Sequence, residues 1–299
     1  MYLSLLLYVS TLPYHSRLRL SGFVYWRSHI AFLSYHISLS DQMDFLKPES
    51  VLDLDNIRSS LIRMEDTILF DLIERAQFHR SARVYTYGSF DSLGKYSFLE
   101  WMLRETEHMH SELRRYESPD ENPFFEDALA EPLLPHLNYP DVLATYQKEI
   151  NLNSLILKHY IESIVPMISA GPNEQPENYG SCTMCDIQAL QALSRRIHFG
   201  KFVAESKFRQ DEEKMAELIR AKDTEGILSL ITKPAVEKQV LKRVREKAES
   251  YNLDPHTNLR WSQKTQGKIN PESIVEIYEN CIIPFTKEVE VQYLLRRLE

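Results

Sequence analysis

Two cations stand on one predicted helix in a pattern suited to holding a small anion. Apolar residues recur every three or four positions across 184–208, which predicts a helix. Arg196 and Lys207 lie eleven positions apart in this segment, about three turns, so they project from nearly the same face. Gly200 and Val203-Ala204 lie between them. The pattern predicts a recess in which desolvation strengthens hydrogen bonds to an anion, although an unrelated pair of cations would simply extend into water.

Arg58 is a third cation whose surroundings call for a partner. Its helical neighbours are Leu54, Leu61 and Ile62, so it lies in an apolar stripe rather than on the charged face of its helix. A cation in that position needs a carboxylate. The sequence leaves open whether an internal acid or a ligand supplies it.

The last predicted helix carries two polar residues on one face. Thr286 and Glu290 are four positions apart and therefore neighbours, while Lys287 and Glu288 are predicted to point elsewhere. Glu290 taken alone is equally well explained as a solvated acid.

Other signatures of chemistry are weak. The segment 88–95 resembles a phosphate loop, but its spacer is one residue too long and Tyr96 stands where a magnesium-binding hydroxyl belongs. Cys182 and Cys185 have metal-like spacing without a second pair, so we expect helical thiols and no metal site. We also expect no cofactor.

Composition favours a helical protein of a reducing compartment. The chain has 299 residues, 43% of them hydrophobic, and only 8 glycines, which suits long helices around a sizeable core and argues against a design rich in strands and turns. The net charge of -8 argues against a nucleic-acid partner. Three cysteines form no disulfide framework, so we expect a cytoplasmic protein.

The apolar period predicts an all-α fold, a single elongated domain of long amphipathic helices. One long helix is expected over 49–78, because apolar residues from Val51 to Leu72 recur every three or four positions. Pro166 and Pro284 fall inside helical patterns and should kink them. Loops are expected at 118–123, 171–176 and 261–270, where helix-breaking residues gather. The remaining helices are expected over 96–116, 154–168, 213–221, 235–251 and 272–298.

Residues 1–42 differ from the rest, since no acidic residue precedes Asp41. The apolar run 2–9 is too short to span a bilayer and has no basic region ahead of it, so we expect neither a membrane anchor nor a strong secretory signal. A poorly ordered leader or a misassigned gene start fits this extension. Met43, followed by a helix start, favours the second and places the functional domain at 43–299.

Several segments together resemble eukaryotic chorismate mutases of the fungal and plant type. The segment 193–208, which reads LSRRIHFGKFVAESKF, is similar to that family's signature helix. Further segments resemble the family in the right order, and the resemblance covers 43–299. They are Asn56-Ile-Arg58, Met64-Glu-Asp66, residues 114–121 (RRYESPDE), Asn138-Tyr-Pro140, Asn178-Tyr-Gly-Ser181 and residues 286–298 (TKEVEVQYLLRRL).

The resemblance implies a Claisen rearrangement of chorismate to prephenate on the route to phenylalanine and tyrosine. This pericyclic step needs no nucleophile or metal, only a held conformer and stabilised charge on the ether oxygen. By resemblance, Arg58 and Arg196 grip the two carboxylates with help from Thr286, and Lys207 donates to the ether oxygen. Glu237 holds the substrate hydroxyl. Glu290 is the second donor to the ether oxygen, which requires its protonated form.

The resemblance also implies regulation in a homodimer, with tyrosine as inhibitor and tryptophan as activator bound between subunits. The matching positions are Arg114, Arg115, Asn178, Gly180 and Ser181. Taken without the family, these residues are equally well explained as a helix start beside a surface arginine pair. Three departures stand out: Met184 and Asn270 replace hydroxyl residues of fungal relatives, and Lys233 replaces an asparagine near the substrate.

Two competing interpretations remain open. One is a non-catalytic helical paralogue that kept the dimer and the effector site but lost turnover; the match at all six expected catalytic positions argues against it. The other is a secreted mutase, which the missing basic region before Tyr2 disfavours.

Overall fold

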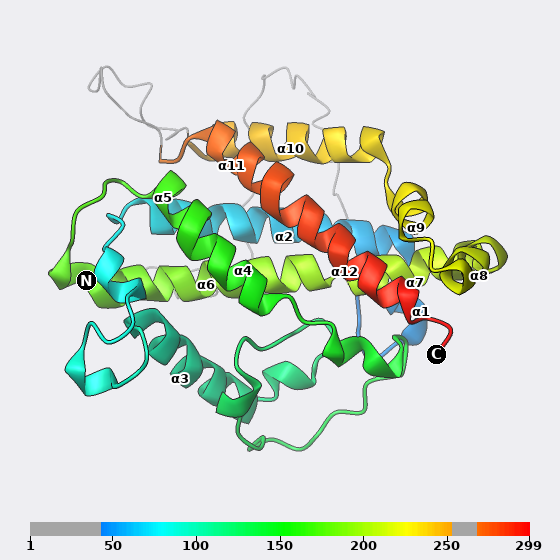
Figure 1. The fold of residues 1–299 in the computed structure, drawn as a ribbon, viewed down its shortest axis with the longest axis horizontal. Coiled ribbons are helices and arrows are strands. Elements are labelled where there is room, and N and C mark those ends of the chain that lie inside the picture. Colours follow the sequence, from blue (N-terminus) through cyan, green and yellow to red (C-terminus); the bar gives the residue numbers. More distant parts are fainter. Residues whose placement is uncertain (1–42, 253–267) are drawn as a thin grey trace, which may run out of the picture. The chain divides into compact units, whose positions relative to one another are not determined.

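The structure, a computed structural model, describes residues 43–252 and 268–299, in which every regular element is helical. The predicted all-α class is confirmed (Figure 1). No helix of the described residues has the length and apolar character needed to cross a membrane. The expectations for residues 1–42 and 261–267 lie outside the described residues.

Twelve α-helices are described. They are α1 (Pro48–Val51), α2 (Leu54–Ala76), α3 (Phe98–Glu112), α4 (Asn153–His159), α5 (Val165–Ile168), α6 (Tyr179–His198), α7 (Gly200–Gln210), α8 (Glu212–Ala221), α9 (Thr224–Ile231), α10 (Pro234–Asn252), α11 (Pro271–Ile277) and α12 (Ile283–Leu295). Short 3-10 turns occupy Ala82–Tyr85, Asp91–Leu93, Arg115–Glu117, Glu126–Ala128, Thr145–Glu149 and Pro176–Asn178. Helix α9 was not predicted, because eight residues carry little periodic signal.

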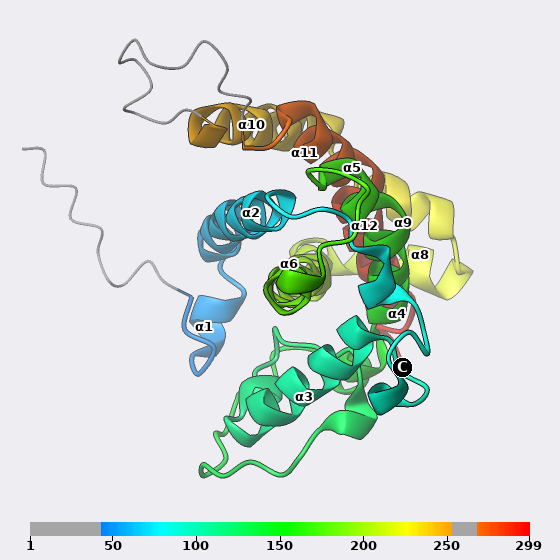
Figure 2. The same cartoon turned by 90° about the vertical axis from the view of Figure 1, so that its left-hand side faces the viewer.

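Helices α2 and α6 lie side by side at the centre of the described fold (Figures 1 and 2). Ile68 and Leu72 on α2 and Leu190 and Leu193 on α6 are at most 1% exposed and belong to one hydrophobic cluster. Burying each such side chain stabilises the fold by about 1.5–3 kcal/mol relative to leaving it in water. The pair therefore forms a rigid base for side chains that project from either helix.

The predicted helix over 49–78 is two helices, which corrects the sequence interpretation. Asp53 takes an extended conformation, and its side chain accepts hydrogen bonds from the backbone nitrogens of Asp55 and Asn56. This N-cap begins α2 and ends the short α1 before it. The apolar spacing runs through the break, because Val51 is buried just as Ile57 is.

Both prolines that were expected to kink their helices follow a π-helical turn. The turn Tyr160–Ile164 precedes Pro166, and the turn Tyr278–Ile282 precedes Pro284. A proline ring crowds the carbonyl four residues earlier. A π turn adds one residue to that part of the helix, which makes room for the ring.

Helices α7 and α12 approach closely at Gly200. A Cβ atom there would lie 2.9 Å from the carbonyl oxygen of Thr286 and 3.4 Å from Cγ of Glu290. The glycine therefore lets α12 press its polar face against α7. Lys207, Thr286 and Glu290 are brought to the same side of the fold in this way.

Helix α10 closes the remaining side of this region. It begins at Pro234, and the carbonyl of Lys233 accepts hydrogen bonds from the backbone nitrogens of Val236 and Glu237 at 2.9 and 3.1 Å. Farther along, Arg243 binds the buried Glu65 of α2 with two hydrogen bonds of 2.8 and 2.6 Å. These hydrogen bonds tie α10 to α2.

Candidate active site

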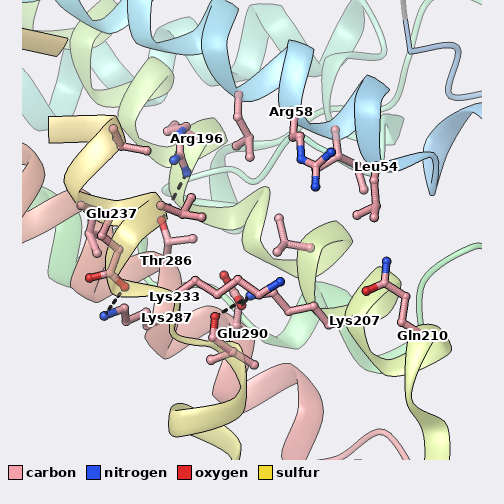
Figure 3. Close-up of a pocket in the computed structure, with 17 residues that line it drawn as sticks. Leu54, Arg58, Arg196, Lys207, Gln210, Lys233, Glu237, Thr286, Lys287 and Glu290 are labelled. Atoms are coloured by element: carbon pink, nitrogen blue, oxygen red, sulfur yellow. Dashed lines mark hydrogen bonds and ion pairs between the residues drawn. The ribbon is translucent and has the colours of Figure 1, made fainter. Parts of the chain in front are cut away.

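The predicted cations and acids meet at one cavity bounded by α2, α6, α7, α10 and α12. Its volume is about 260 Å³, and seventeen residues line it (Figure 3). All six positions expected to act in catalysis are among them: Arg58, Arg196, Lys207, Glu237, Thr286 and Glu290. Most other lining residues are apolar, as at Leu61 and Ile283. An apolar chamber with a few convergent polar groups is typical of a site for a small molecule.

Arg196 is a buried cation near the C-terminal end of α6. Only 7% of it is exposed, and burial lowers its pKa. Its Nη1 lies 3.5 Å from Oγ1 of Thr286, and its Nε has no hydrogen-bond partner in the described part of the chain. A guanidinium remains charged in a protein. Arg196 is therefore prepared to accept an anion from outside the chain.

The buried acid Glu65 does not neutralise Arg196, because other cations already bind it. Glu65 is 1% exposed and accepts two hydrogen bonds from Arg243, and Nζ of Lys247 lies 3.2 Å away. The hydroxyl of Tyr278 is also buried without a described partner. Arg196 thus keeps its net positive charge toward the cavity.

Lys207 and Glu290 form an ion pair on the cavity wall. Nζ of Lys207 lies 2.8 Å from Oε2 of Glu290, and it also donates to the carbonyl of Ile231 at 2.9 Å. Glu290 is 6% exposed. Burial raises its pKa, and the nearby Lys207 and Arg196 oppose the rise. The pair offers two adjacent hydrogen-bond donors whenever Glu290 carries a proton.

The side chains of Arg58 and Glu237 are more exposed than those of Lys207 and Glu290. Nη1 of Arg58 lies 2.9 Å from Oδ1 of Asp55, three residues earlier, and both side chains are largely exposed. The partner left open by the sequence is thus a surface acid. Such exposed pairs contribute at most about 1 kcal/mol, so Arg58 can exchange Asp55 for a ligand carboxylate. Glu237 lies 2.7 Å from Nζ of Lys287.

Comparison with known proteins gives a consistent result. The family model described as chorismate mutase type II matches residues 178–291. A chorismate mutase of Pichia angusta is 54% identical over 258 residues, which cover 86% of this chain and 91% of the relative. The chorismate mutase of Saccharomyces cerevisiae is 51% identical over 260 residues, which cover 86% of this chain and 100% of the relative. The chain belongs to the chorismate mutase family.

Solved chorismate mutase structures share the fold. The Candida albicans enzyme in complex with L-Trp matches with a TM-score of 0.82 and 53% identity, over 86% of this chain and 96% of that one. AtCM1 with tyrosine bound in its allosteric site matches with a TM-score of 0.74 and 42% identity, over 83% of this chain and 97% of that one. The helical architecture is therefore that of the chorismate mutase family.

The chorismate mutase cavity includes residues that sequence reasoning misplaced or missed. The prediction that Lys287 points elsewhere is wrong: it lines the cavity and pairs with Glu237. Adjacent helical residues are about 100° apart, but the long side chain of a lysine can extend across that angle. Lys233 and Gln210 also line it, whereas Ala204 is buried in the core and Ile62 is exposed. The family resemblance places Lys233 near the substrate without including it among the site residues; no periodic pattern marks it, since it lies between helices.

The five positions expected to bind effectors in a chorismate mutase fall into two groups. Arg114 and Arg115 follow α3, where Arg115 pairs with Glu121 at 3.0 Å and donates to Gln191 at 2.9 Å. The second group lies around the start of α6: Asn178, Gly180 and Ser181. Gln191 is ten residues beyond Ser181, which separates the groups by about 15 Å along α6. One chain therefore does not bring the five residues together.

The structure places both residues that were expected to depart from fungal chorismate mutases, Met184 and Asn270. Met184 is exposed on α6. The side chain of Asn270 accepts a hydrogen bond of 3.1 Å from the backbone nitrogen of Glu272 and caps α11. Asparagine is as good an N-cap as serine or threonine.

Proposed function

We propose that this protein catalyses the rearrangement of chorismate to prephenate. The observation that carries the proposal is Arg196, a buried cation with no acid of its own in the described residues, beside the Lys207–Glu290 pair in a small apolar cavity. A dianion fits this set because each carboxylate meets a cation, and the remaining donors face the atoms between them.

The reaction is an intramolecular exchange of bonds. The ether C–O bond breaks while a new C–C bond forms, and negative charge grows on the ether oxygen. Arg196 with Thr286 holds one carboxylate and Arg58 the other, which fixes the compact conformer. Lys207 and protonated Glu290 donate to the ether oxygen, where their stabilisation is greatest in the transition state. Glu237, shared with Lys287, accepts from the substrate hydroxyl.

Loss of chorismate absorbance tests the function directly. The full chain and the chain from Met43 are both expected to consume chorismate and yield prephenate. Replacing Lys207 with Met removes one donor to the ether oxygen, so we expect kcat to fall at least about a hundredfold. Circular dichroism checks that the variant is folded. No chorismate loss by either wild-type chain would contradict the proposal and favour the non-catalytic regulator.

We propose further that the protein is a homodimer inhibited by tyrosine and activated by tryptophan. Two features support effector binding between subunits. The effector positions form two groups about 15 Å apart on one chain, so a partner copy is needed to complete a site. Related structures hold tryptophan, and tyrosine in an allosteric site. Exposed apolar side chains at Met109, Leu113 and Leu133 offer a surface for the partner.

The remaining expectations concern location and organisation. We propose a cytoplasmic enzyme whose domain at 43–299 contains both catalytic and regulatory parts. The net charge of -8 supports a small-molecule role over binding to nucleic acid. Fractionation of native cells, with mass spectrometry of the mature N-terminus, tests the location and the nature of residues 1–42. Recovery of the native protein in an organelle or the medium would contradict it.

A further inference from the structure

Lys233 is a cation in the cavity wall that the proposed mechanism does not use. Five cations and two carboxyl groups line the cavity. Lys207 pairs with Glu290 and Lys287 with Glu237, while Arg58 pairs with Asp55. Within the described ranges, Lys233 and Arg196 are the two lining cations that form no ion pair. The buried one is Arg196 and the exposed one is Lys233.

The backbone holds Lys233 at a place where a lysine does not favour the fold. Its carbonyl accepts the first hydrogen bonds of α10, from Val236 and Glu237, so it occupies the N-cap position. Asparagine, aspartate, serine and threonine stabilise helix starts there, whereas a cation opposes the positive end of the helix dipole. Pro234 next to it disfavours the helical backbone conformation for Lys233, and the side chain of Lys233 lines the cavity. Residues that disfavour folding and face a cavity are often functional.

We propose that Lys233 binds a substrate carboxylate at the solvent side of the cavity, together with Arg58, and so sets the affinity for the dianion. This inference rests on the proposed function. The carboxylates keep their charge throughout the rearrangement, so an ion pair with one of them stabilises ground state and transition state equally. Lys233 therefore lowers KM and leaves kcat unchanged.

The variant Lys233→Asn tests this role, with Lys238→Asn as the matched control. Lys238 is also an exposed lysine of α10 but does not line the cavity. We expect Lys233→Asn to raise KM about fivefold without changing kcat, since a partly exposed ion pair is worth about 1 kcal/mol. With increasing salt concentration, KM of the wild type should also rise more steeply than KM of Lys233→Asn. Lys233→Arg should restore the affinity, and Lys238→Asn should match the wild type.

Two outcomes overturn the inference. One is a KM for Lys233→Asn within about twofold of the wild type; the other is a fall in kcat at constant KM. Because asparagine is a good N-cap, thermal unfolding should show no loss of stability that would explain a change in affinity. Calorimetric titration with an unreactive dicarboxylate of the transition state's shape tests Lys233 without turnover. Equal binding by wild type and variant would overturn the inference in the same way, whereas binding by neither would contradict the proposed function on which it rests.

Discussion

At the residue scale, the protonation of Glu290 decides whether the ether oxygen has one donor or two. Burial raises its pKa, against the opposing effect of Lys207. Below that pKa the carboxyl group donates a hydrogen bond; above it, the carboxylate accepts hydrogen bonds and repels the dianion. We therefore expect kcat/KM to fall as pH rises through the pKa of Glu290. A pH profile of the wild-type rate measures this.

The variant Glu290→Gln keeps a hydrogen-bond donor at this position but removes the group that titrates. An amide donates a hydrogen bond at every pH, so the variant should keep its activity at alkaline pH, where the wild type declines. The profile of Glu237→Gln serves as the control, because that position accepts a hydrogen bond in the proposed mechanism. A Glu290→Gln variant that is inactive across the whole range would remove the proposed role.

At the element scale, the contact between α7 and α12 sets the distance from Lys207 to Glu290. In Gly200→Ala the new Cβ meets the Thr286 carbonyl oxygen at 2.9 Å, a backbone atom that cannot turn aside. Alanine improves helix propensity by about 1 kcal/mol, but overpacking costs about 1–3 kcal/mol. We expect kcat to fall at least about tenfold, because small displacements of catalytic groups are costly. Steady-state kinetics together with thermal unfolding checks both effects, and full activity would refute the contact's importance.

The helices were largely predictable because one feature, burial of an apolar stripe, dominates them. The stripe on α2 continued through the break at Asp53, so periodicity could not reveal that the aspartate caps a new helix. The π turns before Pro166 and Pro284 depend on how each helix relieves a local clash. Spacing predicted that Arg196 and Lys207 share a face. It could not predict that Lys287 lines the cavity, where it pairs with Glu237 of α10, a helix distant in sequence.

At the scale of the whole molecule, we expect Lys201 to make the free energy of unfolding depend on pH. Its side chain is fully buried, and its Nζ donates to Oδ1 of Asn122 at 2.8 Å and to Oε1 of Gln147 at 3.4 Å. Burial lowers its pKa from 10.5 to about 7, with a smaller effect from Lys148. Between these values the folded chain binds fewer protons than the unfolded chain. The stability that Lys201 contributes through this titration is therefore fully present above pH 10.5. It is lost progressively as the pH falls from 10.5 to about 7.

The variant Lys201→Met removes this titration. From pH 7 to 9, the free energy of unfolding of the wild type should increase relative to that of the variant by up to about 1.4 kcal/mol per pH unit. Urea unfolding at several pH values measures the difference. Lys158→Met, at an exposed site on α4, is the control and should run parallel to the wild type. A constant difference between wild type and Lys201→Met would show that Lys201 stays charged in the folded chain.

We expect catalysis not to depend on dimer formation, because every proposed catalytic position lies on one chain. The exposed fraction is 51% for Met109 and 56% for Leu113, which lie one turn apart at the end of α3. The backbone nitrogen of Leu133 donates a hydrogen bond to the carbonyl oxygen of Glu112, next to Leu113 in the sequence. Adding charge here with Met109→Glu leaves the chain's own core intact but opposes burial against a second copy.

We expect Met109→Glu to sediment as a monomer, keep basal turnover of chorismate and lose its response to tyrosine and tryptophan. The response is lost because the Arg115 group and the Ser181 group then have no partner to complete a site. Leu155→Glu, which adds the same charge to the exposed face of α4, is expected to remain dimeric and regulated. Sedimentation velocity combined with turnover assays, with and without effectors, distinguishes these outcomes. A monomer that still responds to tyrosine would place the whole effector site on one chain.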